Sequence, residues 1–99
     1  MRKKMAKIKT YRYDPADFLK TDEDYAGYLT ECIRLDDGDG KTIRAALDAI
    51  TRAKGITKVA KEIGMTRQGL AKALSENGNP QMSVFFNLIR VFGLQVSLA

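Results

Sequence analysis

The chain has 99 residues, 44% of them hydrophobic, which is enough for one small domain with its own core and too little for two. It contains no histidine and a single cysteine, Cys32, which excludes an internal disulfide, a cysteine zinc site and every histidine-dependent catalytic triad. The formal net charge is +5, and it is spread unevenly along the chain.

The charge falls into three blocks. Residues 1–12 carry six basic side chains and no acid, residues 13–40 carry nine acids against two bases, and residues 41–99 carry nine bases against three acids. We therefore expect surfaces of opposite sign that serve different partners, the alternative being an unevenly charged surface that contacts only solvent. Because no histidine or metal-ligand cluster accompanies the acids, we expect no enzyme, no metal site and no cofactor.

In chain order, residues 1–12 are predicted to be a flexible basic arm and residues 13–99 a single helical domain. The basic N-terminus is not followed by an apolar segment, so no secretory signal is expected. The last 17 residues are rich in apolar side chains, but Asn87, Arg90 and Gln95 interrupt them. This pattern argues against a membrane span and favours a cytoplasmic protein.

Asp14 and Pro15 are typical of a helix start, with the aspartate as N-cap and the proline at the first helical position. We expect a short helix from Pro15 to about Lys20, with Phe18 and Leu19 turned inward. Strands would need longer alternating runs of Val, Ile and Thr than this chain offers, so the class is all-α or nearly so.

Thr21 is predicted to cap the next helix, and Asp24 three residues later completes a near match to a capping box. This helix should run to about Leu35, because apolar residues recur at helical spacing. Those residues are Tyr25, Tyr28, Leu29, Cys32 and Ile33. The following sequence DDGDG lacks the glycine positions of an EF-hand or a phosphate-binding loop, so we expect a turn in which Asp39 caps the next helix.

That next helix should begin at Gly40 or Lys41 and run to Lys54, where Gly55 ends it. Apolar residues at intervals of three, four and seven predict its buried face. They are Ile43, Ala46, Leu47, Ile50 and Ala53.

Residues 57–75 combine two short helices, KVAKEI capped by Thr57 and RQGLAKAL capped by Thr66, with Gly64 at positive φ between them. Two helices joined by a short turn containing glycine form the helix-turn-helix arrangement. The expected contacts between them are Val59, Ala60, Ile63, Met65, Leu70 and Ala73. Because glycine is a poor helix former, we attribute Gly69 to a close approach of DNA or of the partner helix.

Exposed residues at the start of the second short helix are candidates for reading DNA, because that turn of a recognition helix reaches base edges in the major groove. Arg67 suits the two acceptors of guanine, Gln68 suits the donor and acceptor of adenine, and Lys72 completes the set. The side chains placed to contact phosphates are Thr66, Lys58, Lys61, Asn77 and Asn79. The alternative is a solvated helix face without a ligand.

The last helix should run from about Met82 to Phe92 and be followed by LQVSL, which alternates like a short strand. Its apolar residues surround more of the helix than one face can bury, which favours a homodimer over a monomer whose last helix is wholly internal. The candidate interface residues are Phe86, Ile89, Val91 and Val96.

The stretch VAKEIGMTRQGLAKALSENGNP, followed by a helix ending in FGL, resembles the Xre/Cro-like helix-turn-helix regulators of phages and bacteria. From about Tyr13 to Val96 the chain resembles the probable addiction-module antidote proteins, the HigA-like antitoxins. The matching segments are Tyr13-Asp14-Pro15, Leu19-Lys20-Thr21, Tyr28-Leu29, Arg52-Ala53-Lys54-Gly55, Gly69-Leu70 and Gly78-Asn79-Pro80.

The resemblance implies an all-α, compact five- to six-helix domain with a short C-terminal strand or extended tail. It also implies a protein that binds operator DNA, usually as a dimer, and silences a small basic toxin of the RelE/ParE type. By position, Arg67, Gln68 and Lys72 match the base-reading sites of such proteins, and Thr66 matches the cap. Relatives often have Glu and an aromatic residue in place of Gln68 and Ala71, so no operator sequence is carried over.

The acidic block is the candidate toxin surface, because a toxin that binds RNA must be basic where the RNA lies. The residues proposed for it are Asp22, Glu23, Asp24 and Tyr25, with Tyr13, Phe18 and Tyr28 as further aromatic candidates. Alternatively, the acids only balance charge elsewhere, and the protein is a stand-alone repressor of a phage or operon with no toxin. A neighbouring reading frame that encodes a small basic protein would distinguish the two.

Overall fold

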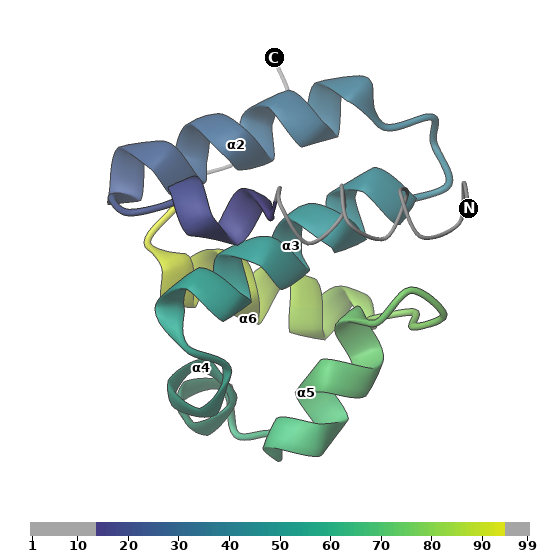
Figure 1. The fold of residues 1–99 in the computed structure, drawn as a ribbon. Coiled ribbons are helices and arrows are strands. Elements are labelled where there is room, and N and C mark those ends of the chain that lie inside the picture. Colours follow the sequence, from purple (N-terminus) through teal and green to yellow (C-terminus); the bar gives the residue numbers. More distant parts are fainter. Residues whose placement is uncertain (1–13, 95–99) are drawn as a thin grey trace, which may run out of the picture.

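A computed structural model describes residues 14–94, and every regular element within that range is helical (Figure 1). A short 3-10 helix precedes five α-helices: η1 (Pro15–Phe18), α2 (Asp22–Leu35), α3 (Lys41–Lys54), α4 (Ile56–Ile63), α5 (Arg67–Leu74) and α6 (Met82–Phe92). The predicted all-α class is therefore confirmed. The expected arm over 1–12 and residues 95–98 of the expected strand lie outside the described residues.

Helix α3 is the centre of the domain, because it packs against η1, α2, α4 and α5, while α6 packs against α4. Figure 1 shows α2 at one end of the molecule and the pair α4 and α5 at the other. The largest fully buried side chains are Leu47, Ile50, Thr51, Val59, Leu70, Leu74, Leu88 and Phe92. No helix within residues 14–94 has the length and apolar character needed to cross a membrane.

The first elements that the structure describes, η1 and α2, form largely as their predicted caps indicate. Asp14 accepts a hydrogen bond from the backbone N–H of Ala16 at 3.1 Å, and Thr21 forms the expected capping box with Asp24. The inward position predicted for Phe18 is wrong, since this side chain is 61% exposed while Leu19 is buried. The helix ends at Phe18 and Leu19 is extended, so the two side chains leave the backbone in different directions.

The cap of α3 differs from the prediction. Asp36, not Asp39, accepts hydrogen bonds from the N–H groups of Thr42 and Ile43, at 3.0 and 3.2 Å. The same carboxylate also accepts from the N–H groups of the two turn glycines, Gly38 and Gly40. Burial acts to raise the pKa of Asp36, but these four donors outweigh it and hold the pKa below its ordinary value. Asp39 accepts only from the N–H of Lys41, at 2.9 Å.

Two cations near the end of α3 hold the first elements in place. Arg52 donates from Nη1 to Asp14 at 2.5 Å and from Nε to Asp48 at 3.0 Å. The hydrogen bond from Arg52 lowers the pKa of Asp14 against the opposing effect of burial. The Lys54 ammonium lies 4.9 Å from the centre of the Tyr25 ring, which anchors α2 by a cation–π contact.

Replacing Asp36 with Asn should destabilise the domain at neutral pH and reduce the loss of stability in acid. The folded pKa of Asp36 is depressed, so its contribution is complete above the ordinary aspartate pKa of about 3.9 and is lost as pH falls through the folded value. Urea unfolding at pH 7 and pH 3 measures this difference. Asp37→Asn is the matched control, because Asp37 makes no side-chain hydrogen bond within residues 14–94. An Asp36→Asn protein with the pH dependence of the parent would contradict the assignment.

Candidate nucleic-acid interface

A tight turn at Gly64 sets α4 and α5 at a fixed angle. Gly64 is in the left-handed region with φ of 77°, as predicted, and the N–H of Met65 donates to the Ala60 carbonyl at 2.9 Å. Ala60 is buried, and Leu70 and Leu74 of α5 are completely buried, so one side of α5 is committed to the core. The predicted cap Thr57 is wrong, because α4 begins at Ile56 and Thr57 lies within its first turn.

Both ends of α5 are tied down by specific hydrogen bonds. The Thr66 hydroxyl accepts from the N–H of Gly69 at 2.9 Å, which confirms the predicted N-cap. At the other end, Arg44 of α3 donates from Nη1 to the backbone carbonyl of Leu74 at 2.7 Å. A cation is favourable at a helix C-terminus because it neutralises the exposed carbonyl dipoles. Arg44 carries no local sequence signal for this role, since it contacts a residue 30 positions away.

The exposed face of α5 carries the predicted base-reading residues, but not side by side. Successive residues rotate by about 100° around a helix, so Gln68, Ala71 and Ser75 form the middle of the exposed stripe. Arg67 lies on the flank toward α4, where its guanidinium donates to the Thr57 hydroxyl at 3.3 Å. Sequence reasoning missed Ala71 and Ser75, although their spacing from Gln68 was a usable signal.

Lys72 lies on the opposite flank of α5, beside a shallow groove of about 360 Å³. The groove separates α5 from the loop that follows it, and its lining is Gly69, Lys72, Ala73, Ser75, Asn77, Gly78 and Asn79. The two phosphate candidates Asn77 and Asn79 are thus brought together with Lys72. Lys58 and Lys61 are exposed on α4, at the same end of the molecule.

Close contacts at two glycines of the candidate interface show why a larger residue would not fit there. A Cβ on Gly78 would lie 2.2 Å from the carbonyl oxygen of Ala73 and 2.4 Å from that of Lys72, so the loop can pack on α5 only with glycine there. A Cβ on Gly69 would meet the Thr66 hydroxyl at 2.9 Å and no atom of α4 within 4 Å. The expected approach of the partner helix at Gly69 is therefore wrong, and the cap hydroxyl is its close neighbour.

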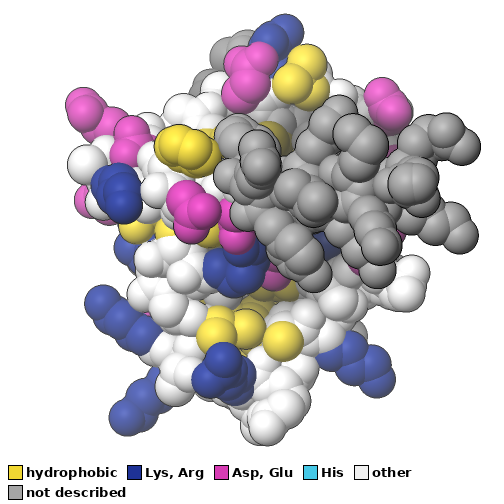
Figure 2. All heavy atoms as spheres, viewed as in Figure 1, with side chains coloured by type: hydrophobic (Ala, Val, Ile, Leu, Met, Phe, Trp, Pro, Cys, Tyr) yellow, Lys and Arg dark blue, Asp and Glu magenta, His cyan; other side chains and the backbone are white. Residues whose placement is uncertain are grey.

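Charge is separated between the two ends of the domain. On the face shown in Figure 2, most acidic side chains lie in the upper half, around η1 and α2, where some Lys and Arg are also present, whereas the charged side chains that extend from the lower half, over α4 and α5, are mainly Lys and Arg. Asp22 and Glu23 are exposed, whereas the Asp24 carboxylate is occupied by the N–H groups of Lys20 and Thr21. Tyr25 is only 7% exposed, so its ring belongs to the core and we withdraw it from the toxin surface.

The residues predicted for a dimer interface differ in their burial. Ile89 is 7% exposed and belongs to the core of the single chain, so it is withdrawn from the interface. Val91 is half-buried and packs against that core, and Val96 lies outside the described residues. Phe86 remains exposed on the outer side of α6. Among the described residues, no group of three or more potential ligands is placed to hold a metal ion.

An all-helical domain with two short helices joined at a fixed angle by a glycine turn is consistent with the helix-turn-helix type. Residues 9–99 match the family described as "Probable addiction module antidote protein", and the chain belongs to this family. It is also 34% identical over 83 residues to an uncharacterized protein of Haemophilus influenzae, with 84% of each chain covered. No solved structure matches the chain. An antidote acts on a toxin, so family membership implies a toxin partner.

Alanine at two glycines should have opposite effects. Gly78→Ala should destabilise the domain by about 1–3 kcal/mol, because the new methyl group overlaps two backbone carbonyls. Gly27→Ala is the matched control in α2, where a Cβ meets no atom within 4 Å, and it should stabilise by about 0.5–1 kcal/mol. Urea unfolding gives both values. A Gly78→Ala protein with parental stability and unchanged amide shifts at Asn77 and Asn79 would show that the loop does not pack as described.

Proposed function

We propose that the protein is a sequence-specific DNA-binding antitoxin of a type II toxin–antitoxin module, of the HigA-like, Xre/Cro-like kind. In this proposal it neutralises a RelE/ParE-type toxin and represses its own operon as a homodimer. The observation that carries the DNA-binding part is the exposed stripe of α5, whose buried side and both ends are fixed to the rest of the domain.

In the proposed complex the first turns of α5 enter the major groove. Gln68 stands near the middle of the stripe, and its amide matches the donor and acceptor of adenine. Arg67 exchanges its contact with Thr57 for the two acceptors of a guanine. Ala71 presents a methyl group between them, which suits the methyl group of thymine. Lys72 reaches a base or the adjoining backbone from the groove beside α5.

Phosphate contacts surround this stripe. Lys58 and Lys61 of α4 lie on one side, and Asn77 and Asn79 of the loop lie on the other. Thr66 uses its oxygen to cap α5, and its hydroxyl hydrogen remains to be donated to a phosphate. No side chain caps α4 within the described residues, so its first N–H groups are available to an anion. These contacts position the protein and carry no sequence information.

The toxin is proposed to bind the opposite end of the domain. Asp22 and Glu23 in the first turn of α2 are exposed, and neither carboxylate has a hydrogen bond within residues 14–94. A basic RNA-binding surface is attracted to such a patch, and complementary charge accelerates the encounter. Because α2 and α5 lie at opposite ends of the molecule (Figure 1), toxin and DNA can bind the same chain together. A stand-alone repressor without a toxin is the competing proposal, and family membership argues against it.

Substitutions on α5 and α4 should alter DNA binding in different ways. Arg67→Ala should relax the choice of one or two base pairs, because a good bidentate base contact is worth about 1–3 kcal/mol of discrimination. Lys61→Ala should weaken binding to all sequences and reduce the log–log salt slope by about 0.9. Titration of duplexes from the region upstream of the gene, at several salt concentrations, measures both effects. Lys20→Ala removes the same charge near α2 and should leave binding unchanged. Parental discrimination by Arg67→Ala would exclude the base-reading role.

Neutralising the exposed acids of α2 should slow association with the toxin several-fold and weaken its dependence on salt. The pair Asp22→Asn and Glu23→Gln tests this without touching Asp24, whose loss would break the capping box. The pair Glu62→Gln and Glu76→Gln changes the net charge equally on the DNA-binding half and should not slow association. Stopped-flow mixing with a RelE/ParE-type toxin, taken from the neighbouring reading frame if that frame encodes one, gives the rates. If both pairs behaved alike, α2 would not be the toxin surface.

A further inference from the structure

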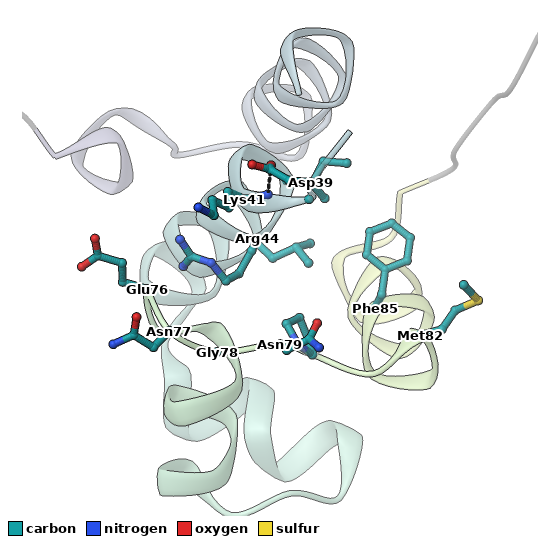
Figure 3. Close-up of a pocket in the computed structure, with 13 residues that line it drawn as sticks. Asp39, Lys41, Arg44, Glu76, Asn77, Gly78, Asn79, Met82 and Phe85 are labelled. Atoms are coloured by element: carbon teal, nitrogen blue, oxygen red, sulfur yellow. Dashed lines mark hydrogen bonds between the residues drawn. The ribbon is translucent and has the colours of Figure 1, made fainter. Parts of the chain in front are cut away.

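A cleft of about 660 Å³ lies between the start of α3, the loop after α5 and the start of α6 (Figure 3). Its apolar lining includes Ile43, Leu47 and Phe85, and Asn79 lies in its centre. This volume is within the range of sites that accept a large side chain or a small molecule. The cleft is separate from the acidic surface of α2 and from the exposed stripe of α5, but it shares Asn77, Gly78 and Asn79 with the groove beside α5.

An exposed aromatic side chain stands directly beside this cleft. Phe86 is 53% exposed and packs edge-to-face on Phe85, with 5.3 Å between ring centres and 70° between ring planes. Met82, one helical turn earlier on α6, is 73% exposed and lines the cleft. The same small area of the surface therefore holds both a projecting anchor and a hollow of suitable size. In a two-fold interface every patch meets its own copy, so an anchor beside a hollow is self-complementary.

The charges around the cleft select among possible occupants. Asp39 and Glu76 are acidic, and Lys41 and Arg44 are basic, so the rim is balanced. A strongly basic toxin gains no net attraction from such a rim, and neither does DNA. A second copy presents the same four charges in reversed order across a two-fold axis, where each sign can meet its opposite.

We propose that this face joins two copies of the chain, with Phe86 of each copy inserted into the cleft of the other. The cleft also contains Arg44, which caps the end of α5, so the contact would lie beside the recognition helices and fix their separation. The inference extends the homodimer of the proposed function. Its main readout, the mass of the particle in solution, involves neither DNA nor toxin, so its failure is distinguishable from a failure of the DNA-binding or toxin-binding proposals.

Two variants of the full chain test the insertion directly. Phe86→Ala removes the anchor, and Asn79→Trp fills the cleft. Each variant alone should raise the Kd of the dimer by roughly a thousandfold, because two contacts of hot-spot size are lost from every dimer. An equal mixture should form a heterodimer, since the intact anchor of Asn79→Trp fits the intact cleft of Phe86→Ala. Native mass spectrometry separates the three dimers by mass, and light scattering shows whether the parent has twice the 11.0 kDa mass of the chain.

Phe18→Ala is the matched control, because it removes a similarly exposed phenylalanine from η1 and should leave the dimer intact. Circular dichroism verifies that each variant is folded. If Asn79→Trp does not fold, the comparison of dimer affinity between Phe86→Ala and Phe18→Ala tests the proposal by itself. A monomeric parent at high micromolar concentration would overturn the proposal, as would a Phe86→Ala dimer of parental affinity or a mixture without heterodimer. Loss of toxin binding by Phe86→Ala from a monomeric parent would assign the cleft to the toxin instead.

Discussion

The complete burial of Leu70 and Leu74 is the interaction on which the proposed DNA interface depends. Helix α5 has eight residues, and isolated helices of that length are not stable in water. Its existence and its direction therefore come from the packing of these two side chains, from the Thr66 cap and from the Arg44 bond to the last carbonyl. Because the buried side is fixed, the stripe centred on Gln68 and Ala71 must face outward. The same packing that stabilises the domain thus decides which residues can meet a ligand.

The end of the domain that carries η1 and α2 is held together by interactions that do not involve α4 or α5. This independence is compatible with the proposed binding of two partners. Asp36 joins the end of α2 to the start of α3, and Arg52 holds η1 against α3 through Asp14. These acids are engaged in structure, so the acidic block is not uniformly available to a partner. Asp22 and Glu23 remain exposed in the first turn of α2, on the far side of α3 from α5. In the proposed function the toxin binds the end of the domain that carries α2 and DNA binds the end that carries α5, and these two ends differ in charge.

Patterns within a few residues predicted much of this fold. Helical spacing located all five α-helices, and the Thr21 and Thr66 caps and the Gly64 turn form as their local chemistry indicates. The sequence does not identify Asp36 as the cap of α3, because several acids precede that helix. Only the path of the backbone through the turn shows which carboxylate reaches the free N–H groups. Arg44 and Gly78 owe their roles to contacts that form only when distant or looped segments pack, and no spacing signals them. Tyr25 and Ile89 occupy helical positions that are compatible with either the core or a partner surface, and only the packing of the helices against each other distinguishes the two.

The central claim is that DNA contacts α5, the start of α4 and the loop after α5, while α2 stays available to the toxin. Amide chemical shifts of the nitrogen-15-labelled protein, followed while duplex DNA from the upstream region is added, test it most directly. The account predicts large changes at Thr66 to Lys72 and in the loop around Asn77, with α2 unperturbed. Changes centred on α2 and η1, or none that distinguish the upstream duplex from an unrelated one, would contradict it.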